Sequence, residues 1–232
     1  MGTFLRARWV NLALVTYRVP GELLEWRLPT GCELDRRDGE AFVSLVAFDF
    51  VATQVLGVGW PGFRNFPEIN LRFYVRRGEQ RGVCFVREFV PSRVVAALAK
   101  GIYNEPYRAA RMKSWTEETE AEITVRHELW VGAKRHCVEV CGAKPAFRPG
   151  VESAEHFFKE HQWGFGRGRD GGLVRYEVVH PEWNIYPVQK VALDWDWAAV
   201  YGAEWSILQE AKPYSVVLAA GSVVAVYPKK RG

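Results

Sequence analysis

The sequence predicts a mainly β protein of the α+β class, folded as one domain over residues 1–232 with two or three peripheral helices. Its 232 residues are 48% hydrophobic and 25% charged, which is the balance of a folded globular protein. Short runs of β-branched and aromatic residues recur between clusters of Gly, Pro and charged residues. No repeat of fixed period and no Ser/Pro-rich linker divides the chain, so we expect a single barrel or sandwich.

Eight segments have the composition and the boundaries of β-strands. They are residues 43–51, 69–75, 83–90, 123–130, 173–180, 188–193, 215–219 and 223–227. Residues 220–222, with the sequence Ala-Gly-Ser, are predicted to join the last two strands as a hairpin. The glycine-rich segment 164–172 is predicted to be a flexible hairpin tip.

Two segments are predicted to be helices because a capping serine precedes apolar residues at helical spacing. Ser92 can cap a helix that continues to residue 102 and that Asn104 and Pro106 bring to an end. Ser153 can cap a second helix over residues 154–162. Both helices interrupt the β pattern, so we place them at the periphery of the sheet.

The charge of the chain gives little support to a nucleic-acid partner. Lys and Arg number 31 and Asp and Glu number 27, which gives a net charge of +4 at neutral pH. Much of this excess lies in the tail at residues 229–231 instead of along one face. We therefore expect the protein not to bind nucleic acid.

The first residues of the chain do not have the pattern of a signal peptide. Asn11 interrupts the apolar stretch, which ends at Tyr17 and Arg18 instead of at small residues. No window reaches the ~20 apolar residues that a helix needs to span a bilayer. We expect a cytoplasmic protein without a membrane partner.

A polar strand face at residues 68–72 is the first candidate site. Strand alternation places Glu68, Asn70 and Arg72 on one face and the apolar residues between them on the other. If the polar face points into a barrel, it lines a ligand cavity. The alternative is a solvated strand face, because charged side chains are mostly exposed.

The segment after the first predicted helix is the second candidate site. Tyr107, Arg108 and Arg111 follow Pro106, which forces a bend in the chain. An Arg side chain can hold a carboxylate or a phosphate through two hydrogen bonds, and a Tyr hydroxyl can donate a further one. The alternative is that the arginines pair with Glu105 or with carbonyls at the helix end.

Two histidines are candidate general bases or ligand-binding residues, because imidazole titrates near neutral pH. His127 lies inside a predicted strand, and His180 ends another. The alternative for each is a structural hydrogen bond, since a base needs an orienting partner that the sequence does not display.

The sequence predicts no metal site and no cofactor. The five histidines include no H-x-H or H-E-x-x-H spacing, and the cysteines include no C-x-x-C pair. G-x-S-x-G, P-loop and strand-linked G-x-G-x-x-G motifs are also missing, which removes the usual support for a hydrolase triad or a nucleotide. We expect four buried, reduced thiols at Cys32, Cys84, Cys137 and Cys141.

Six segments carry a resemblance that covers nearly the whole chain. They are residues 4–9 (FLRARW), Leu28-Pro29-x-Gly31, residues 41–48 (AFVSLVAF), residues 66–72 (FPEINLR), the stretch from Gly164, and His180-Pro181-x-Trp183. In order and spacing they resemble the YqjF-like family of uncharacterised bacterial proteins. That family is more distantly similar to acetoacetate decarboxylase, so the resemblance implies an antiparallel, cone-shaped β-barrel that encloses a ligand cavity.

The resemblance implies the place of a site without carrying over its reaction. The decarboxylase forms a Schiff base through a lysine that a neighbouring lysine and an apolar site keep unprotonated. Tyr107 and Arg108 stand where the paired lysines would stand, and neither side chain can form a Schiff base. Glu68 matches the strand glutamate of that family.

We therefore predict a small-molecule enzyme or binder that takes an organic acid, such as a keto acid, into the barrel cavity without Schiff-base chemistry. Arg108 would hold the acid together with Tyr107 or Arg111, and Glu68 would act as acid or base. The remaining ligand-binding candidates are Asn70, Arg72, His127 and His180. The alternative is a non-catalytic ligand-sensing or partner-binding module on the same fold. A homo-oligomer is compatible with both.

Overall fold

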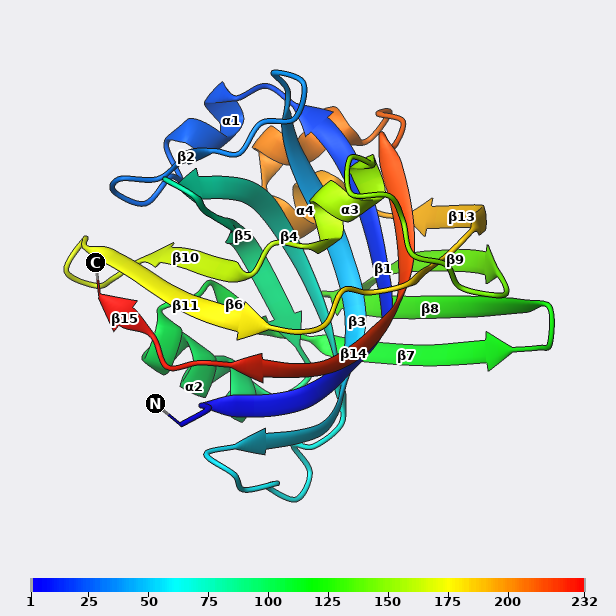
Figure 1. Ribbon diagram of the computed structural model, residues 1–232, viewed down its shortest axis with the longest axis horizontal. Helices are drawn as coiled ribbons and strands as arrows, with labels where there is room; N and C mark the ends of the chain where they lie inside the picture. The colour runs from blue at the N-terminus through cyan, green and yellow to red at the C-terminus, as the bar shows by residue number, and fades with distance from the viewer. Residues whose placement is uncertain (1, 232) are drawn as a thin grey trace.

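The computed structural model describes residues 2–231, which form two β-sheets with short helices around them (Figure 1). The larger sheet contains β1 (Leu5–Val19), β2 (Glu33–Leu34), β3 (Ala41–Val55), β4 (Phe66–Arg77), β5 (Gln80–Val90), β6 (Tyr107–Ala109), β10 (Trp163–Arg167), β11 (Leu173–Val179), β12 (Ile185–Tyr186), β14 (Ser215–Val226) and β15 (Lys230–Arg231). The smaller sheet contains β7 (Arg111–Glu118), β8 (Glu122–Val131), β9 (Lys134–Ala143) and β13 (Val188–Asp194). The predicted mainly β class is confirmed.

Four α-helices and one 3-10 helix lie among the described residues, more than the two or three predicted. They are α1 (Glu22–Glu25), α2 (Arg93–Tyr103), α3 (Ala154–Lys159), α4 (Trp197–Tyr201) and η1 (Ala203–Leu208). Helices α1 and α4 are too short to give a helical period in the sequence. Within residues 2–231, every helix falls short of the length and apolar character needed to cross a bilayer.

The two predicted helices begin at the predicted capping serines. Ser92 Oγ accepts a hydrogen bond from the backbone amide three residues later at 3.3 Å, and Ser153 Oγ accepts the equivalent bond at 3.1 Å. Asn104 ends α2 in a left-handed conformation. Helix α3 ends at Lys159, three residues earlier than predicted.

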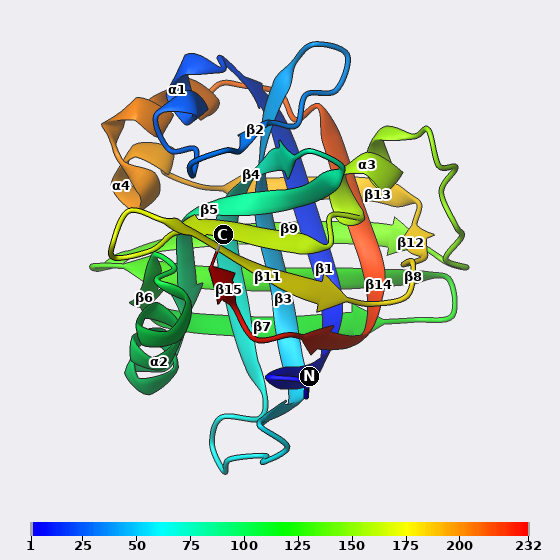
Figure 2. The same ribbon diagram turned by 60° about the vertical axis from the view of Figure 1, so that its left-hand side comes forward.

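The strand pairings of the larger sheet close a ring. The order is β14-β1-β3-β4-β5-β10-β11, and β11 pairs back to β14 through Val178 opposite Val226. Figure 2 shows β10 and β11 nearer to the viewer than β1 and β3, so the two pairs of strands lie on opposite sides of the ring. The expectation of an antiparallel sheet is wrong at two places, because β10 and β6 each run parallel to β5. At the first of these, a Cβ on Gly82 would lie 2.3 Å from the Trp163 carbonyl oxygen, so the close pairing requires glycine.

Alternation along β3 and β4 gives the ring an outer and an inner face. On the outer face, Leu71 packs with Leu129 of the smaller sheet in the main hydrophobic core. On the inner face, Phe48 packs with residues of β1 and β14 in a second apolar cluster. Glu68 lies directly opposite Phe48 in the β3–β4 pairing, so the polar face of β4 is the inner face.

Helix α3 covers one end of the inner face. Phe157 and Phe158 pack with Phe42 of β3 and Tyr74 of β4 in a third apolar cluster. At the other end of β4, Phe66 packs against the second cluster. The polar residues of β4 therefore lie between two apolar groups.

The hairpin predicted at residues 215–227 is wrong. Residues 215–226 form one continuous strand that pairs with β1. Gly221 has a φ of +73° and lies opposite Val10, beside a bulge in β1 between Val10 and Ala13. The Ala-Gly-Ser segment therefore bends a single strand where β1 bulges, and it makes no turn.

We expect Gly221→Ala to destabilise the fold more than Gly132→Ala. Both glycines have positive φ, but a Cβ at Gly221 would lie 1.9 Å from the Trp9 carbonyl oxygen, whereas a Cβ at Gly132 meets nothing within 4 Å. The strained φ costs roughly 1–2 kcal/mol at either position, and the overlap adds about 1–3 kcal/mol at Gly221. Urea denaturation would measure both free energies of unfolding. Equal losses would contradict the close approach of β14 to β1.

Candidate functional site

Three strands bring buried polar side chains together on the inner face of the ring. Glu68 and Asn70 come from β4, Glu88 lies opposite Asn70 on β5, and Tyr107 lies beside Glu88 on β6. Glu105 precedes β6, and it too is buried, as are Glu68, Asn70 and Glu88. We call these five residues the acid cluster. The alternative interpretation of residues 68–72, a solvated strand face, is wrong for Glu68 and Asn70.

Hydrogen bonds inside the acid cluster converge on Glu68. Asn70 Nδ2 donates to Glu68 Oε1 and the Tyr107 hydroxyl donates to Glu68 Oε2, each at 3.0 Å. By contrast, one carboxyl oxygen of Glu88 and one of Glu105 are buried without a hydrogen-bond partner among residues 2–231. These two carboxyl oxygens and the side-chain amide oxygen Oδ1 of Asn70 are left to interact with another group.

Burial raises the pKa of all three carboxyl groups of the acid cluster. It raises the pKa of Glu68 to about 7, although hydrogen bonds from Asn70 and Tyr107 and the charge of Arg72 lower it. Burial raises the pKa of Glu105 to about 8 in the same way. The pKa of Glu88 rises well above its ordinary value through burial and then through the charges of Glu68 and Glu105. Such groups can donate as well as accept a proton near pH 7.

Glycines of β10 make room for this cluster. A Cβ on Gly164 would lie 2.2 Å from Cζ of Tyr176, so the Tyr176 ring lies directly against the strand backbone. A side-chain hydrogen bond from Tyr176 lowers the pKa of Glu105, against the larger effect of burial. Residues 164–167, predicted as part of a flexible tip, therefore belong to strand β10, and the turn is confined to residues 168–172.

Arg72 lies on the inner face two residues beyond Asn70. Its Nη2 donates to the Phe158 carbonyl oxygen of α3 at 2.9 Å, and its Nε is buried without a hydrogen-bond partner in the described chain. Within residues 2–231, Arg72 forms no ion pair with a carboxylate. Its charge acts on three buried groups, because it lowers the pKa of Glu68, His161 and His180.

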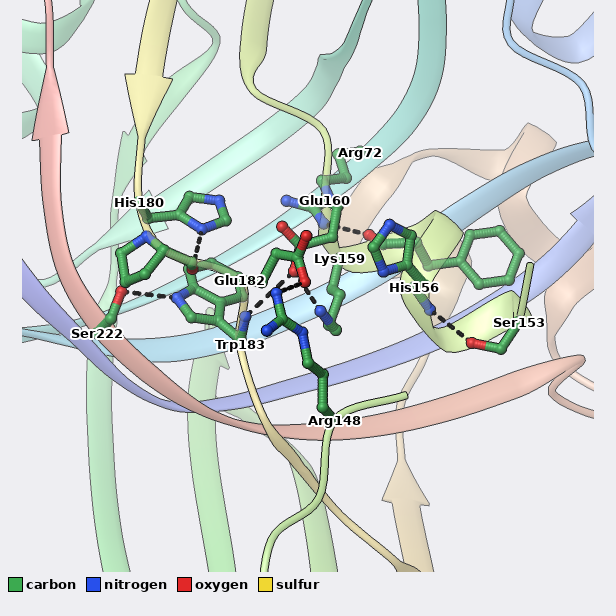
Figure 3. Close-up of polar contacts among 12 residues, drawn as sticks. Arg72, Arg148, Ser153, His156, Lys159, Glu160, His180, Glu182, Trp183 and Ser222 are labelled. Atoms are coloured by element: carbon green, nitrogen blue, oxygen red, sulfur yellow. Dashed lines mark hydrogen bonds and ion pairs between the residues drawn. The ribbon is translucent and has the colours of Figure 1, made fainter. Parts of the chain in front are cut away.

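A buried ion pair and an imidazole lie next to Arg72 (Figure 3). The Lys159 side chain is 1% exposed, and its Nζ bonds to Glu160 Oε1, which also accepts the Trp183 amide at 3.2 Å. The His180 ring stacks on Trp183, with 4.0 Å between centroids and 14° between planes. Burial lowers the pKa of His180, against hydrogen bonding to the Pro181 carbonyl and the charge of Glu160.

The structure brings five of the eight predicted site residues to the inner face or its edge. They are Glu68, Asn70, Arg72, Tyr107 and His180. It does not bring Arg108 to them, because Arg108 is exposed and neighbours in a strand point to opposite faces. Arg111 is also exposed, with its guanidinium 4.5 Å from the centroid of the Trp130 ring.

His127 lies on the other side of the larger sheet. It is completely buried on β8, and its Nε2 is 3.5 Å from Oδ1 of Asp49 on β3. Ser114 Oγ donates to the same carboxylate oxygen at 2.6 Å. Although burial raises the pKa of Asp49, His127 and Ser114 lower it more. This arrangement joins the two sheets and is separate from the acid cluster.

A pocket of about 490 Å³ opens at the surface beside α1 and β2. Its charged lining includes Glu33 and Asp35. Glu33 pairs with Arg76 at 2.9 Å, and Asp35 pairs with Arg81 at 2.7 Å and with His161 at 2.9 Å. Because these charges already have partners, we favour the inner face as the site.

The described residues 2–231 contain no group of three or more His, Cys, Asp or Glu side chains arranged to hold a metal ion. All four cysteines are free. Cys84 and Cys137 are buried as predicted, whereas Cys32 and Cys141 are partly exposed.

Comparison with protein families confirms the resemblance found in the sequence. The model of DUF2071, described as an uncharacterised conserved protein, matches residues 6–223. The uncharacterised protein YqjF of Bacillus subtilis (strain 168) is 31% identical over 112 residues, which are 47% of this chain and 46% of that protein. The aligned part thus spans about half of the relative.

Solved structures with the same fold are acetoacetate decarboxylase-like. An acetoacetate decarboxylase-like enzyme from Sphingomonas wittichii RW1 has a TM-score of 0.68 and 11% identity, covering 100% of this chain and 94% of that one. Acetoacetate decarboxylase from Legionella pneumophila gives 0.63 and 16%, covering 100% and 87%. The enduracididine biosynthesis enzyme MppR complexed with pyruvate gives 0.66 and 13%, covering 100% and 91%. At these identities the likeness concerns the fold.

We expect Glu105→Gln to flatten the loss of stability at alkaline pH. The pKa of Glu105 is raised from 4.5 to about 8 in the folded state, so its contribution to stability is complete below about pH 4.5 and is lost as pH rises through about 8. Glutamine stays neutral throughout. Above about pH 8.5 we expect the variant to exceed the wild type by at least about 1 kcal/mol in free energy of unfolding.

Urea denaturation between about pH 5 and pH 9 would provide this comparison. Glu120→Gln, at an exposed glutamate in the β7–β8 turn, is the control and should follow the wild type at each pH. Parallel curves for Glu105→Gln and the wild type would show that Glu105 ionises as freely as a surface carboxyl.

Proposed function

The chain belongs to the DUF2071 family of uncharacterised conserved proteins, and we propose that it binds a small organic acid of the keto-acid class on the inner face of the ring and moves a proton on that acid. In this proposal the ring is a cone-shaped barrel and residues 1–232 are one domain. Arg72 holds the carboxylate of the ligand, and Glu68 acts on its keto group. No Schiff-base lysine takes part. The cytoplasmic location and the absence of nucleic-acid and membrane partners stay predictions.

The observation that carries the proposal is the unpaired guanidinium of Arg72. It is bonded to one backbone carbonyl, and its Nε is buried without a partner in the described chain. Glu68, the carboxyl group of the acid cluster on which the charge of Arg72 acts, has a pKa of about 7 and is therefore only partly ionised at neutral pH. Burial raises the pKa of Glu88 and Glu105 further, so these two groups keep their protons. A guanidinium with free donors in a low-dielectric setting favours a carboxylate, which it can grip through two hydrogen bonds. This assigns to Arg72 the role that the sequence favoured for Arg108.

Glu68 supports the proton-transfer part of the proposal. Its pKa of about 7 leaves it ready to give or take a proton at neutral pH. The Tyr107 hydroxyl, which donates its hydrogen to Glu68 Oε2 at 3.0 Å, can turn this hydrogen to a developing enolate oxygen and so share its charge. Tyr107 stands where the resemblance places a lysine nucleophile. In this proposal the Tyr107 hydroxyl polarises the keto group of the ligand, and no covalent bond to the protein forms.

The solved relatives support the ligand class. MppR, which shares the fold at a TM-score of 0.66, was solved complexed with pyruvate, the smallest 2-keto acid. Pyruvate carries a carboxylate for Arg72 and a keto oxygen for the Glu68 side. It is therefore the first ligand to test. A protein that binds pyruvate without moving its protons would be the non-catalytic binding module considered from the sequence.

We expect Arg72→Ala to weaken pyruvate binding at least about tenfold, because the carboxylate loses its charged partner. Isothermal titration calorimetry would measure the dissociation constants. Arg76→Ala is the matched control, since Arg76 is on the same strand but exposed and paired with Glu33. Arg108→Ala should bind like the wild type. If only Arg108→Ala loses affinity, the carboxylate is held at the outer residue and the present assignment is wrong.

We expect Glu68→Gln to keep pyruvate affinity within about threefold and to lose proton exchange. The amide keeps the shape and hydrogen bonds of the side chain but cannot transfer a proton at neutral pH. Proton NMR in heavy water would follow replacement of the pyruvate methyl protons by deuterium. Unchanged exchange in the variant would remove Glu68 from the proton transfer while leaving the binding role of Arg72 intact.

A further inference from the structure

The His180 ring is fixed in one orientation and one tautomer. Its Nδ1 lies 2.9 Å from the Pro181 carbonyl oxygen, which can only accept, so Nδ1 carries the hydrogen. In the neutral ring, Nε2 is then left with a free lone pair. Trp183 supports the ring by stacking, and its own Nε1 donates to Ser222 Oγ at 2.8 Å. The imidazole is thus pre-organised by a second layer of contacts.

The free nitrogen of His180 faces the side on which Arg72 lies. The Nδ1 of His180 is bonded to the Pro181 carbonyl oxygen, and in the view of Figure 3 the other ring nitrogen lies on the side of the ring that faces Arg72. The interaction between the two side chains is also electrostatic, because Arg72 lowers the pKa of His180. A carboxylate held by Arg72 would therefore bring the adjacent carbons of a keto acid near Nε2.

Burial and two nearby cations keep the His180 ring neutral. The charges of Lys159 and Arg72 lower the pKa of His180, whereas the hydrogen bond to the Pro181 carbonyl and the charge of Glu160 raise it. Burial has the largest effect and opposes protonation. A neutral imidazole with an available lone pair is the form that can accept a proton.

We propose that His180 Nε2 is the base that removes a proton from the carbon beside the keto group of a 2-keto acid bound at Arg72. This rests on the proposed function and adds a second proton carrier to it. The acid cluster then acts on the keto oxygen, while His180 acts on carbon from the other side of Arg72. The two groups together would enolise the ligand.

The step balances without any co-reactant. A C3–H bond of pyruvate breaks and its proton goes to Nε2, giving an imidazolium. The electron pair of that bond forms the C2=C3 double bond, and the C2=O pair moves to oxygen, which takes a proton from Glu68. In heavy water Nε2 and Glu68 exchange their protons, and the reverse step returns a deuteron to C3.

The test is methyl-proton exchange of pyruvate in heavy water with His180→Gln, followed by proton NMR, alongside calorimetric binding. We expect the variant to bind pyruvate within about threefold of the wild type and to exchange at least about a hundredfold more slowly. His156→Gln is the control, because His156 is a second, partly buried histidine on α3 whose ring forms none of these contacts in the described chain. It should exchange like the wild type.

Three results separate the two proposals. If the wild type does not bind pyruvate, the proposed function fails, and this inference fails with it. If the wild type binds pyruvate but does not exchange it, binding stands, while the proton-transfer part of the proposed function and the role of His180 are both overturned. If the wild type exchanges the protons and His180→Gln exchanges them at the same rate, only the role of His180 is overturned. Should His180→Gln fail to fold, the wild type decides by nitrogen NMR: the inference requires the His180 hydrogen on Nδ1 and a shift of the Nε2 resonance on adding pyruvate.

Discussion

The burial of carboxyl groups without cationic partners is the constraint on which the rest of the structure depends. An ionised carboxylate in an apolar interior costs several kcal/mol, so such a group keeps its proton or finds a counter-charge. Glu88 and Glu105 have no ion pair within the described chain, and burial is the first cause of both raised pKa values. The inner face therefore contains carboxyl groups of raised pKa and a guanidinium that has no ion pair within the described chain, an arrangement that suits an anionic ligand with a carbonyl group.

The fold creates this arrangement by separating two faces of the same strands. The outer face of β4 joins the main core against the smaller sheet, whereas its inner face changes from apolar to polar and back to apolar along the strand. Helix α3 contacts both the apolar and the polar part of the inner face. The Phe158 ring packs in an apolar cluster, while the Phe158 carbonyl oxygen accepts a hydrogen bond from Arg72. The position of the guanidinium thus depends on the packing of a six-residue helix.

Local sequence patterns predicted the features that depend on neighbouring residues, such as strand faces and helix caps. They failed for features that depend on the pairing of strands far apart in the sequence. Alternation placed Glu68, Asn70 and Arg72 on one face, and serine caps located two helices. Burial of that face depends on ring closure, which no local pattern reports. Glu88 was missed because its place beside Asn70 follows from the pairing of β4 with β5. Lys159 was missed because its place in the sequence has the ordinary pattern of a solvated cation at a helix end. Strand β1 was missed because its sequence is largely apolar and shows little alternation.

The pairing of β1 with β14 makes the ends of the chain neighbours, with Leu5 opposite Val226. Closure of the ring accordingly needs contacts between residues more than two hundred positions apart, which is the kind of topology that folds slowly. Until β14 pairs with β1 and β11 the ring is open, so we expect the inner carboxyl groups to stay hydrated up to that point. In a chain truncated before residue 215, the same glutamates would behave as ordinary, ionised surface acids.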